Sequence, residues 1–139
     1  MKATKHSQSG FTLLELMIVV AIVAILSTIA YASYQDQIVR SRRAAAAVCL
    51  QQAAQFVERY YSTSMTYVGA GNPPACDADV AAHYSAPTFT AAPTAKAFTL
   101  QIAPTGAQAT KDTKCGTLSL NQAGARGKSG SAADASECW

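Results

Sequence analysis

A single carboxylate stands at the edge of the longest apolar run in this chain of 139 residues. Glu15 directly precedes the 19 residues from Leu16 to Tyr34, which contain no charged residue, glycine or proline. An ionisable group beside such a run is costly without a partner, so we interpret Glu15 as a functional residue. A structural alternative stays open, because TLLE at 12–15 fits the S/T-x-x-E capping box, in which the glutamate bonds back to the backbone at the helix start.

Four cysteines offer either metal or disulfide chemistry, namely Cys49, Cys76, Cys115 and Cys138. Consecutive cysteines are at least 23 residues apart, whereas metal sites favour paired spacings such as C-x-x-C, so two disulfides are the simpler interpretation. Their order along the chain leaves three pairings open. We prefer Cys49–Cys76, which would tie a helix to the loop after it, with Cys115–Cys138, which would close the C-terminal region and hold Trp139. Such bridges would place this part of the chain outside a reducing cytosol.

The remaining candidates for catalysis or metal binding are weaker. One local cluster has the residue types of a metal site, but its spacing matches no defined site and solvated loop residues are expected: Cys76, Asp77, Asp79 and His83. The segment GARGKSG at 124–130 resembles the end of a phosphate-binding loop, yet Gln122 stands where the first glycine of that motif belongs. We therefore expect a flexible, solvated turn there. Because no set of nucleophile, base and metal is assembled, we expect neither an enzyme nor a cofactor.

Basic residues in the C-terminal half favour anionic partners, DNA included, only weakly. Eleven lysines and arginines against eight acids give a small excess, and no aromatic residues stand nearby to stack bases. The composition, 50% hydrophobic and 14% charged, also excludes a disordered chain. The candidate anion-binding residues are Lys111, Lys114, Arg126 and Lys128.

The apolar run itself predicts a membrane-spanning helix. At ~1.5 Å per residue it gives roughly 28 Å of helix, which is long enough to cross a bilayer. Lys2 and Lys5 precede it, so the positive-inside tendency puts the first residues in the cytoplasm. A cleaved secretory signal peptide is the alternative, but its apolar region would be about 7–15 residues, followed by a small-residue cleavage site.

After Tyr34 the pattern becomes amphipathic. One stripe recurs at helical steps and is expected to face a small core: Ile38, Ala45, Cys49, Gln52, Ala53, Phe56 and Tyr60. No proline or glycine separates this segment from the apolar run, which predicts one helix from about residue 11 to about residue 61, on the order of 75 Å long. Its second half needs a domain that covers the stripe.

Short strands are expected after the helix. From Gly69 the composition shifts to glycine, proline, threonine and serine, which indicates loops. Residues 98–102 and 117–120 alternate apolar and polar side chains and are predicted strands; 88–90 is a further candidate, and 77–86 is a loop or a short helix. A polar connection begins at Pro104. The fold class is therefore α+β, with a small core of one helix face and three or four strands that disulfides would staple.

The run GFTLLE at 10–15, with a short basic leader before it and the apolar stretch after it, closely resembles the class III signal of type IV pilins. The resemblance implies cleavage after Gly10 by prepilin peptidase, N-methylation of Phe11, and transfer of the subunit from the inner membrane into a helical fibre. It also implies that Glu15 meets the amino terminus of a neighbouring subunit, where a buried carboxylate and an ammonium would set the register of assembly. Without residues 1–10 the chain has nine basic and eight acidic residues, so the mature subunit would be near neutral.

Further segments resemble the PilE-type minor pilins of type IV pilus systems: 31–43, 55–61, 114–122 and 137–139. This resemblance implies the pilin fold, in which a long N-terminal helix, its first half transmembrane, packs on a small antiparallel sheet of three or four strands. The organisation would be a leader at 1–10, a transmembrane and assembly half at 11–34, an amphipathic half at 35–61, and a disulfide-stabilised β domain at 62–139. Many pilins have proline at the position of Ala32, and its absence predicts a straighter, more stable helix.

The function that the resemblance implies is that of a minor pilus subunit supporting assembly or priming, with downstream roles in twitching motility and adhesion. Its partners would be other pilin and minor pilin subunits, prepilin peptidase, the inner-membrane assembly machinery and, before assembly, the membrane itself. The subunit would span the inner membrane once with a cytoplasmic N-terminus and then join an extracellular pilus, and no small-molecule substrate is expected. A surface DNA-binding pilin for natural transformation and a type II secretion pseudopilin are the alternatives.

Overall fold

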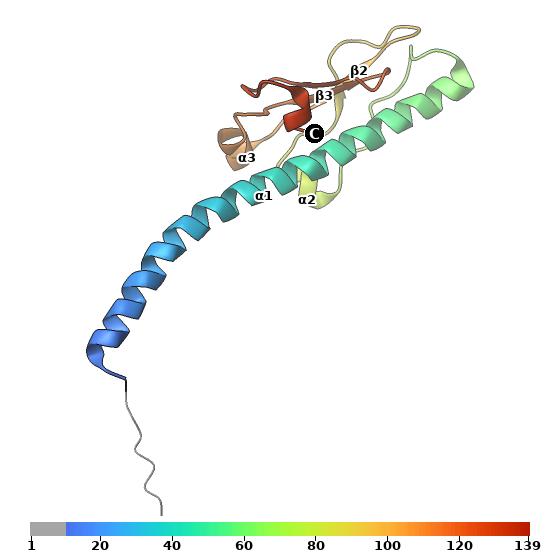
Figure 1. Cartoon of the computed structure of the whole chain (residues 1–139). Helices are drawn as coiled ribbons and strands as arrows, with labels where there is room; N and C mark the ends of the chain where they lie inside the picture. Colours follow the sequence, from blue (N-terminus) through green and yellow to red (C-terminus); the bar gives the residue numbers. More distant parts are fainter. Residues whose placement is uncertain (1–10) are drawn as a thin grey trace, which may run out of the picture. The chain divides into compact units, whose positions relative to one another are not determined.

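The computed structural model describes residues 11–139 (Figure 1). The expected leader, with its cleavage site at Gly10, lies outside the described residues. The described residues divide into two compact units with the boundary between Gln37 and Ile38, and we call the second unit, residues 38–139, the domain. Both units contain part of one helix, α1 (Leu13–Ser64), so the prediction of a single long helix is confirmed and its end lies three residues beyond the expected one.

Helix α1 begins at a side-chain cap and ends at an unusual backbone conformation. Thr12 Oγ1 accepts a hydrogen bond from the Glu15 N–H at 3.2 Å, which satisfies one of the unpaired donors of the first turn. The helix continues through Ala32 without a break. Beyond Ser64, Met65 has a φ of 55°, the left-handed conformation that commonly terminates a helix.

Residues 13–34 of α1 carry apolar side chains that nothing in the described chain covers. Leu13, Met17, Ile25 and Ile29 are examples, each more than half exposed. By length and composition the helix is apolar enough to cross a membrane, and none of its membrane-length apolar window is buried. A surface of this kind requires an apolar surround from lipid or from other helices.

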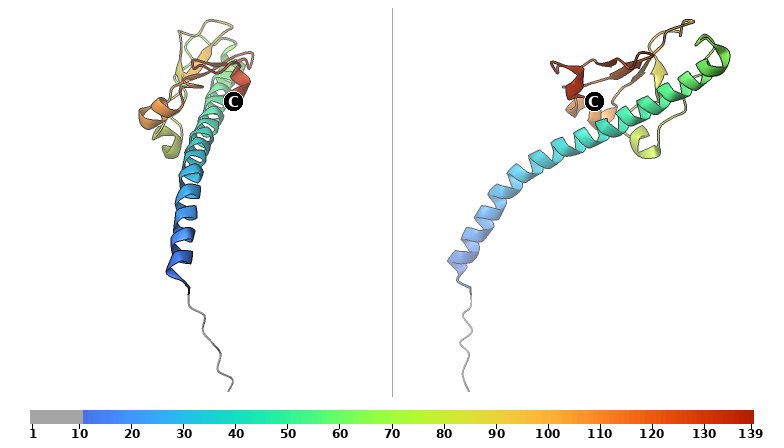
Figure 2. Two further views of the ribbon diagram at one scale, coloured as in Figure 1. Left: turned by 60° about the vertical axis from the view of Figure 1, so that its left-hand side comes forward. Right: turned by 45° about the vertical axis from the view of Figure 1, so that its right-hand side comes forward.

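The domain places a four-stranded antiparallel sheet on the second half of α1 (Figure 2). The strands lie in the order β1 (Thr88–Phe89), β2 (Thr99–Ile102), β3 (Leu118–Asn121) and β4 (Arg126–Lys128). Leu100 opposes Leu120 and Ile102 opposes Leu118, so alternate side chains of β2 and β3 point together toward the helix. Short helices stand outside the sheet: α2 (Ala78–Ala81), α3 (Gly106–Lys111) and the 3-10 turn η1 (Ala135–Glu137).

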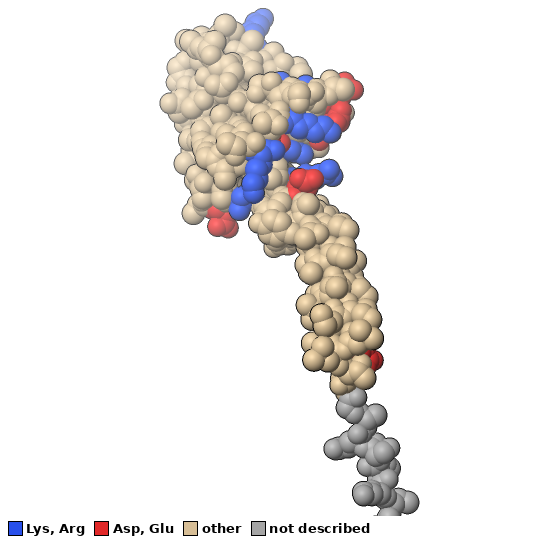
Figure 3. Space-filling view, turned by 90° about the vertical axis from the view of Figure 1, so that its left-hand side faces the viewer, with Lys and Arg blue, Asp and Glu red and all other residues tan. Residues whose placement is uncertain are grey.

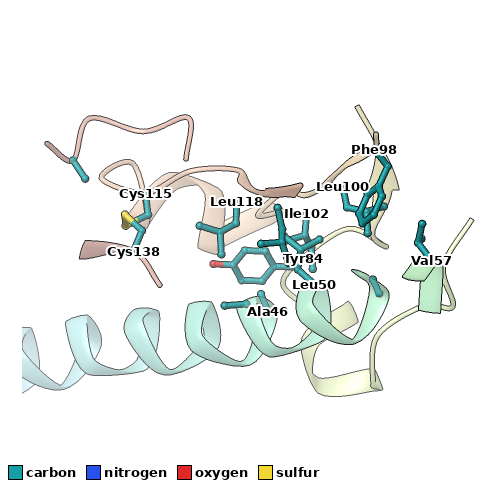
Figure 4. Close-up of a cluster of buried hydrophobic side chains, with 14 of the residues drawn as sticks. Ala46, Leu50, Val57, Tyr84, Phe98, Leu100, Ile102, Cys115, Leu118 and Cys138 are labelled. Atoms are coloured by element: carbon teal, nitrogen blue, oxygen red, sulfur yellow. A yellow bond between two sulfur atoms is a disulfide. The ribbon is translucent and has the colours of Figure 1, made fainter. Parts of the chain in front are cut away.

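The core lies between α1 and the sheet, with Tyr84 filling the space between them (Figure 4). The helix buries a different stripe from the expected one: Val39, Ala46, Ala47, Cys49, Leu50, Ala53 and Val57. Cys49 and Ala53 were predicted correctly, but Ala45, Gln52 and Phe56 are exposed, and that part of the prediction is wrong. Ala46, Leu50, Ala53 and Val57 follow four- and three-residue steps, and the small alanines let the sheet approach the helix. Phe56 is one residue from Val57, about 100° around the helix, and therefore lies on a neighbouring face.

Two segments expected to be irregular are regular. Residues 106–111 form α3 instead of a polar connection, and the buried Gln108 faces inward from it. Residues 126–128 form β4 instead of a flexible turn, because they pair with Leu118–Leu120. Gly127 allows this pairing, since a Cβ there would collide with the Ser119 hydroxyl. The strands predicted at 98–102, 117–120 and 88–90 correspond to β2, β3 and β1, and α2 lies in the segment left as loop or short helix.

Candidate functional site

Glu15 presents a carboxylate without a partner on an apolar helix. The Glu15 backbone makes the bond to Thr12 described above, but the Glu15 side chain has no hydrogen bond or ion pair within residues 11–139. Only one half of the capping box is therefore formed. Phe11 is 85% exposed, and together with Glu15, Leu16 and Val19 it lines an apolar hollow of about 210 Å³. In apolar surroundings this carboxylate would require a cation such as an ammonium group.

Two disulfides fasten the domain, and they have the pairing that we preferred from the sequence. Cys49 of α1 is bonded to Cys76 in the loop before α2, with their Cα atoms 5.8 Å apart. Cys115 before β3 is bonded to Cys138, with their Cα atoms 5.5 Å apart. Within the described residues no cysteine is free. The Cys76 sulfur is thus committed to a disulfide and is not a thiolate that a metal could use.

The last three residues of the chain are joined to two residues that lie just before β3. We call this group the C-terminal clamp: Lys114, Cys115, Glu137, Cys138 and Trp139. Lys114 Nζ lies 2.6 Å from Glu137 Oε2, and this contact lowers the pKa of the Glu137 carboxyl. Trp139 Nε1 donates to the Gly127 carbonyl oxygen at 3.2 Å, which ties the terminus to β4. The Arg126 guanidinium also makes a cation–π contact with the Trp139 ring, 5.2 Å from the ring centroid.

Three of the four basic residues considered for anion binding make intramolecular contacts. Lys114 and Arg126 contact Glu137 and Trp139 as just described, and Lys128 Nζ donates to the Gly130 and Ala132 carbonyls. Lys111 stands exposed in the last turn of α3. On the face shown in Figure 3, basic and acidic side chains lie next to one another and form no patch of one sign. The strength of any anion binding here thus depends on cations that already have intramolecular contacts.

A buried polar network joins α1 to α3, and sequence reasoning missed it. Arg43 Nη1 lies 2.6 Å from Asp112 Oδ1, and the Tyr84 hydroxyl donates to Asp112 Oδ2 at 3.1 Å. Gln108 Nε2 donates to the Val39 carbonyl and to the Tyr84 oxygen, both at 3.1 Å. Burial raises the pKa of Tyr84 to about 12, and the nearby Asp112 carboxylate contributes to the rise. No local motif marks residues that lie up to 69 positions apart in sequence.

A second cavity, of about 180 Å³, lies in the domain between α1 and α2, and we call it the α1–α2 pocket. Its lining consists of Ser41, Arg42, Ala45, Asp79, Val80, His83 and Tyr84. The pocket therefore brings together two members of the sequence cluster considered above, Asp79 and His83. The other two lie apart from it, Cys76 in its disulfide and Asp77 at the start of α2.

Two family models match consecutive stretches of the chain. Residues 5–31 match the family model described as the prokaryotic N-terminal methylation motif. Residues 32–119 match the model described as "Type IV minor pilin ComP, DNA uptake sequence receptor".

Individual relatives are similar over different lengths. The fimbrial protein EcpC of Eikenella corrodens is 47% identical over 58 residues, which cover 42% of this chain and 38% of that protein. The chain thus spans less than half the length of this curated relative. A type IV pilin structure from Shewanella oneidensis is 31% identical with a TM-score of 0.51, and the match covers 73% of this chain and 97% of that one. The non-core minor pilin PilV of Neisseria meningitidis is 24% identical with a TM-score of 0.54, over 68% and 89% of the two chains, and supports the fold alone.

Proposed function

We propose, from the premise that this chain belongs to the family of type IV minor pilins, that it enters a pilus through residues 11–34 and displays the disulfide-bonded domain on the fibre. In this role it supports assembly or priming of the pilus, and twitching motility and adhesion are downstream consequences. Its partners are other pilin and minor pilin subunits, prepilin peptidase and the inner-membrane assembly machinery.

The observation that carries this proposal is the unpaired carboxylate of Glu15 on an apolar helix that the described chain leaves uncovered. Packing that helix among others covers its apolar side chains with protein instead of lipid. The carboxylate would oppose this burial unless a positive charge met it in the same layer. Cleavage after Gly10 would create such a charge on Phe11, four residues away, and a neighbouring subunit could supply it in trans.

The location follows from the same helix. Before assembly, residues 11–34 span the inner membrane once with the leader in the cytoplasm, and after assembly the subunit lies in an extracellular pilus. The apolar helix suits both environments, because lipid and neighbouring helices each cover apolar side chains.

Mass spectrometry of sheared surface fibres, compared with the membranes left behind, tests the proposal. We expect a methylated peptide beginning at Phe11 in the fibres, at a small fraction of the main subunit. Processed peptide found only in the envelope would favour a type II secretion pseudopilin instead. An uncleaved chain in every fraction would contradict the proposal altogether.

A second candidate function is DNA capture at the pilus surface for natural transformation. It is favoured by the match of residues 32–119 to a model whose description names a DNA uptake sequence receptor. Among the candidate anion-binding residues, Lys111 in α3 and Lys114 of the clamp have exposed side chains. Fluorescence anisotropy with duplex DNA at rising salt tests this function, since each phosphate contact that is lost lowers the salt dependence. Binding that is unchanged in a Lys111→Gln, Lys114→Gln double variant would exclude these residues as the contact.

A further inference from the structure

We infer that the Cys49–Cys76 disulfide is a site of thiol–disulfide exchange, at which a thiolate of a dithiol protein attacks the Cys76 sulfur. The second disulfide, Cys115–Cys138, is closed to the same attack. All four cysteines belong to residues 38–139, so the inference concerns the domain alone. It goes beyond the proposed pilus function, and the incorporation of the subunit into fibres plays no part in its test.

The two disulfides differ in how far solvent reaches them. Cys115 and Cys138 are 0% and 2% exposed and lie within the hydrophobic core cluster. Cys49 is 8% exposed on the buried stripe of α1, whereas Cys76 is half-buried and packs against the core from the loop before α2. Access governs which sulfur a thiolate attacks, so Cys76 is the candidate among the four.

The direction of attack at Cys76 follows from the geometry of the exchange. An attacking sulfur approaches along the S–S axis, on the side opposite the sulfur that leaves, and forms a mixed disulfide. Attack on Cys76 therefore comes from the loop side and expels Cys49 toward the helix. Attack on Cys49 would have to come through α1 and the core, which cover that residue.

The loop that carries Cys76 is held by few other interactions. Within the part of the chain that the structure describes, residues 71–76 make no hydrogen bond, and Pro73 is the buried residue between Gly71 and Ala75. A segment with so few hydrogen bonds opens at a low free energy, which gives the active site of a partner access to the bridge.

Two carboxylates beside Cys76 select the charge of the partner. Asp77 and Asp79 are exposed, and neither forms an ion pair within residues 11–139. Asp79 shares the α1–α2 pocket with Arg42 and His83, whereas Asp77 directly follows Cys76 and does not line that pocket. An incoming thiolate is itself negative, so a further negative charge on the surface that carries it adds to the repulsion. The partner is therefore a dithiol protein whose active-site surface carries no net negative charge.

Reduction at this site transfers two electrons from the partner to the chain. The partner's thiolate bonds to Cys76 Sγ, the bond between Cys76 and Cys49 breaks, and Cys49 leaves as a thiolate that takes a proton from water. The partner's second thiol, after losing its proton to water, attacks the mixed disulfide and expels the Cys76 thiolate, which is protonated in turn. The partner becomes a disulfide, the chain gains two thiols, and the reverse sequence installs the bridge.

Opening the bridge would release the loop and α2 from α1 and leave the fold in place. The Arg43 guanidinium and the Tyr84 hydroxyl both contact Asp112, and this network continues to join α1 to α3. The exchange therefore acts as a switch for the attachment of residues 71–81 to the helix.

Partial reduction of the full chain in detergent, under native conditions, tests the inference. The chain is treated with 2-mercaptoethanol, and the thiols formed at each time are alkylated with iodoacetamide and counted by peptide mass spectrometry. We expect the Cys49–Cys76 pair to be labelled at least about a hundredfold faster than the Cys115–Cys138 pair, whose reduction needs an opening of the core. Equal rates, or earlier labelling of the Cys115–Cys138 pair, would overturn the inference.

A mixed-disulfide trap identifies the sulfur that is attacked. A thioredoxin-type protein whose second active-site cysteine is replaced by serine stops after the first step, because it has no thiol to resolve the mixed disulfide. We expect this protein to be joined to Cys76, with Cys49 free for alkylation. Joining to Cys49 or to either cysteine of the other bridge would contradict the direction of attack.

A series of thiols of different charge tests the choice of partner. Cysteamine is positive, 2-mercaptoethanol neutral and 3-mercaptopropionate negative, and their rates are corrected for the thiolate fraction of each reagent. Each step toward negative charge should slow the reduction of Cys49–Cys76 by about threefold, the effect of one unit charge a few ångströms away in water.

Two variants assign this charge effect. Asp77→Asn should flatten the series, whereas Asp134→Asn should leave it unchanged. Asp134→Asn is the matched control, because it removes an exposed carboxylate near the other disulfide, at the start of η1. A series that Asp77→Asn does not change, or that Asp134→Asn changes equally, would overturn the selection of the partner by charge.

Discussion

Arg43 and Asp112 join two distant parts of the chain through an ion pair of 2.6 Å, with Asp112 only 1% exposed. The pair connects the middle of α1 to the residue that follows α3, and the Tyr84 hydroxyl shares the same carboxylate. The apolar packing of α1 against the sheet is non-directional, whereas this pair has one geometry. It therefore fixes the position of α3 along the helix.

Removing Arg43 should destabilise the domain strongly. Arg43→Met would leave the Asp112 carboxylate buried without its counter-charge, which typically costs about 3–5 kcal/mol. Urea unfolding of the full chain in detergent, followed by Trp139 fluorescence, measures the change. Arg40→Met is the control on the same helix, and as an exposed substitution it should shift stability by no more than about 0.5 kcal/mol. Equal effects of the two variants would show that the buried pair adds nothing.

Tyr84 should make the domain sensitive to alkali. Its pKa is raised from 10.0 to about 12, so between these values the unfolded chain releases the phenolic proton and the folded chain keeps it. Stability from this group is complete below pH 10 and is lost as the pH rises toward 12. Unfolding midpoints measured between pH 9 and pH 12 show how steeply the stability of the domain falls with pH, which is the slope to be compared. In Tyr84→Phe the slope should become shallower, and an unchanged slope would assign it to other groups.

The disulfide of the C-terminal clamp should contribute about 3 kcal/mol of stability through the chain entropy of its loop. Cys115 and Cys138 are separated by 23 residues, and both are buried, so the double replacement by alanine removes the bridge without adding polar atoms. Removing the Cys49–Cys76 bridge, with a separation of 27, should cost a similar amount. Retention of full stability in the Cys115→Ala, Cys138→Ala variant would mean that the Lys114–Glu137 ion pair and the contacts of Trp139 hold the terminus without the bridge.

The sequence was sufficient to predict the elements whose pattern is local. Strands β2 and β3 alternate apolar and polar residues, and α1 has no helix breaker over 52 residues, so both follow from short-range rules. The buried face of α1 was harder to predict from the sequence. Phe56 is the more hydrophobic side chain, but the sheet covers Ala53 and Val57. Burial there depends on how closely the sheet can approach, which is a tertiary property.

Other features depend on partners far away in the sequence. Residues 126–128 have little strand propensity, and β4 exists because β3 pairs with it on one side and Trp139 bonds to Gly127. Arg42 and Asp79 are 37 positions apart, and only the packing of α2 beside α1 brings them to the same pocket. Patterns within one segment carry no information about such pairs. By contrast, the unusual position of Glu15 is visible in the sequence, because a charge next to a long apolar run is rare.

Glu15→Ala tests the role of the unpaired carboxylate. The variant loses no intramolecular side-chain bond, because only the Glu15 backbone contacts Thr12, so the helix and its processing should remain normal. Incorporation into fibres should fall strongly, since the new amino terminus on Phe11 would then be buried without a counter-charge. Counting subunits in sheared fibres by mass spectrometry gives the measurement, with Asp36→Ala, an exposed acid further along α1, as the matched control. If Glu15→Ala is incorporated at the level of this control, the Glu15 carboxylate has no role in assembly. Glu15 would then act only at the helix start, and the apolar surface of the helix would be sufficient for assembly.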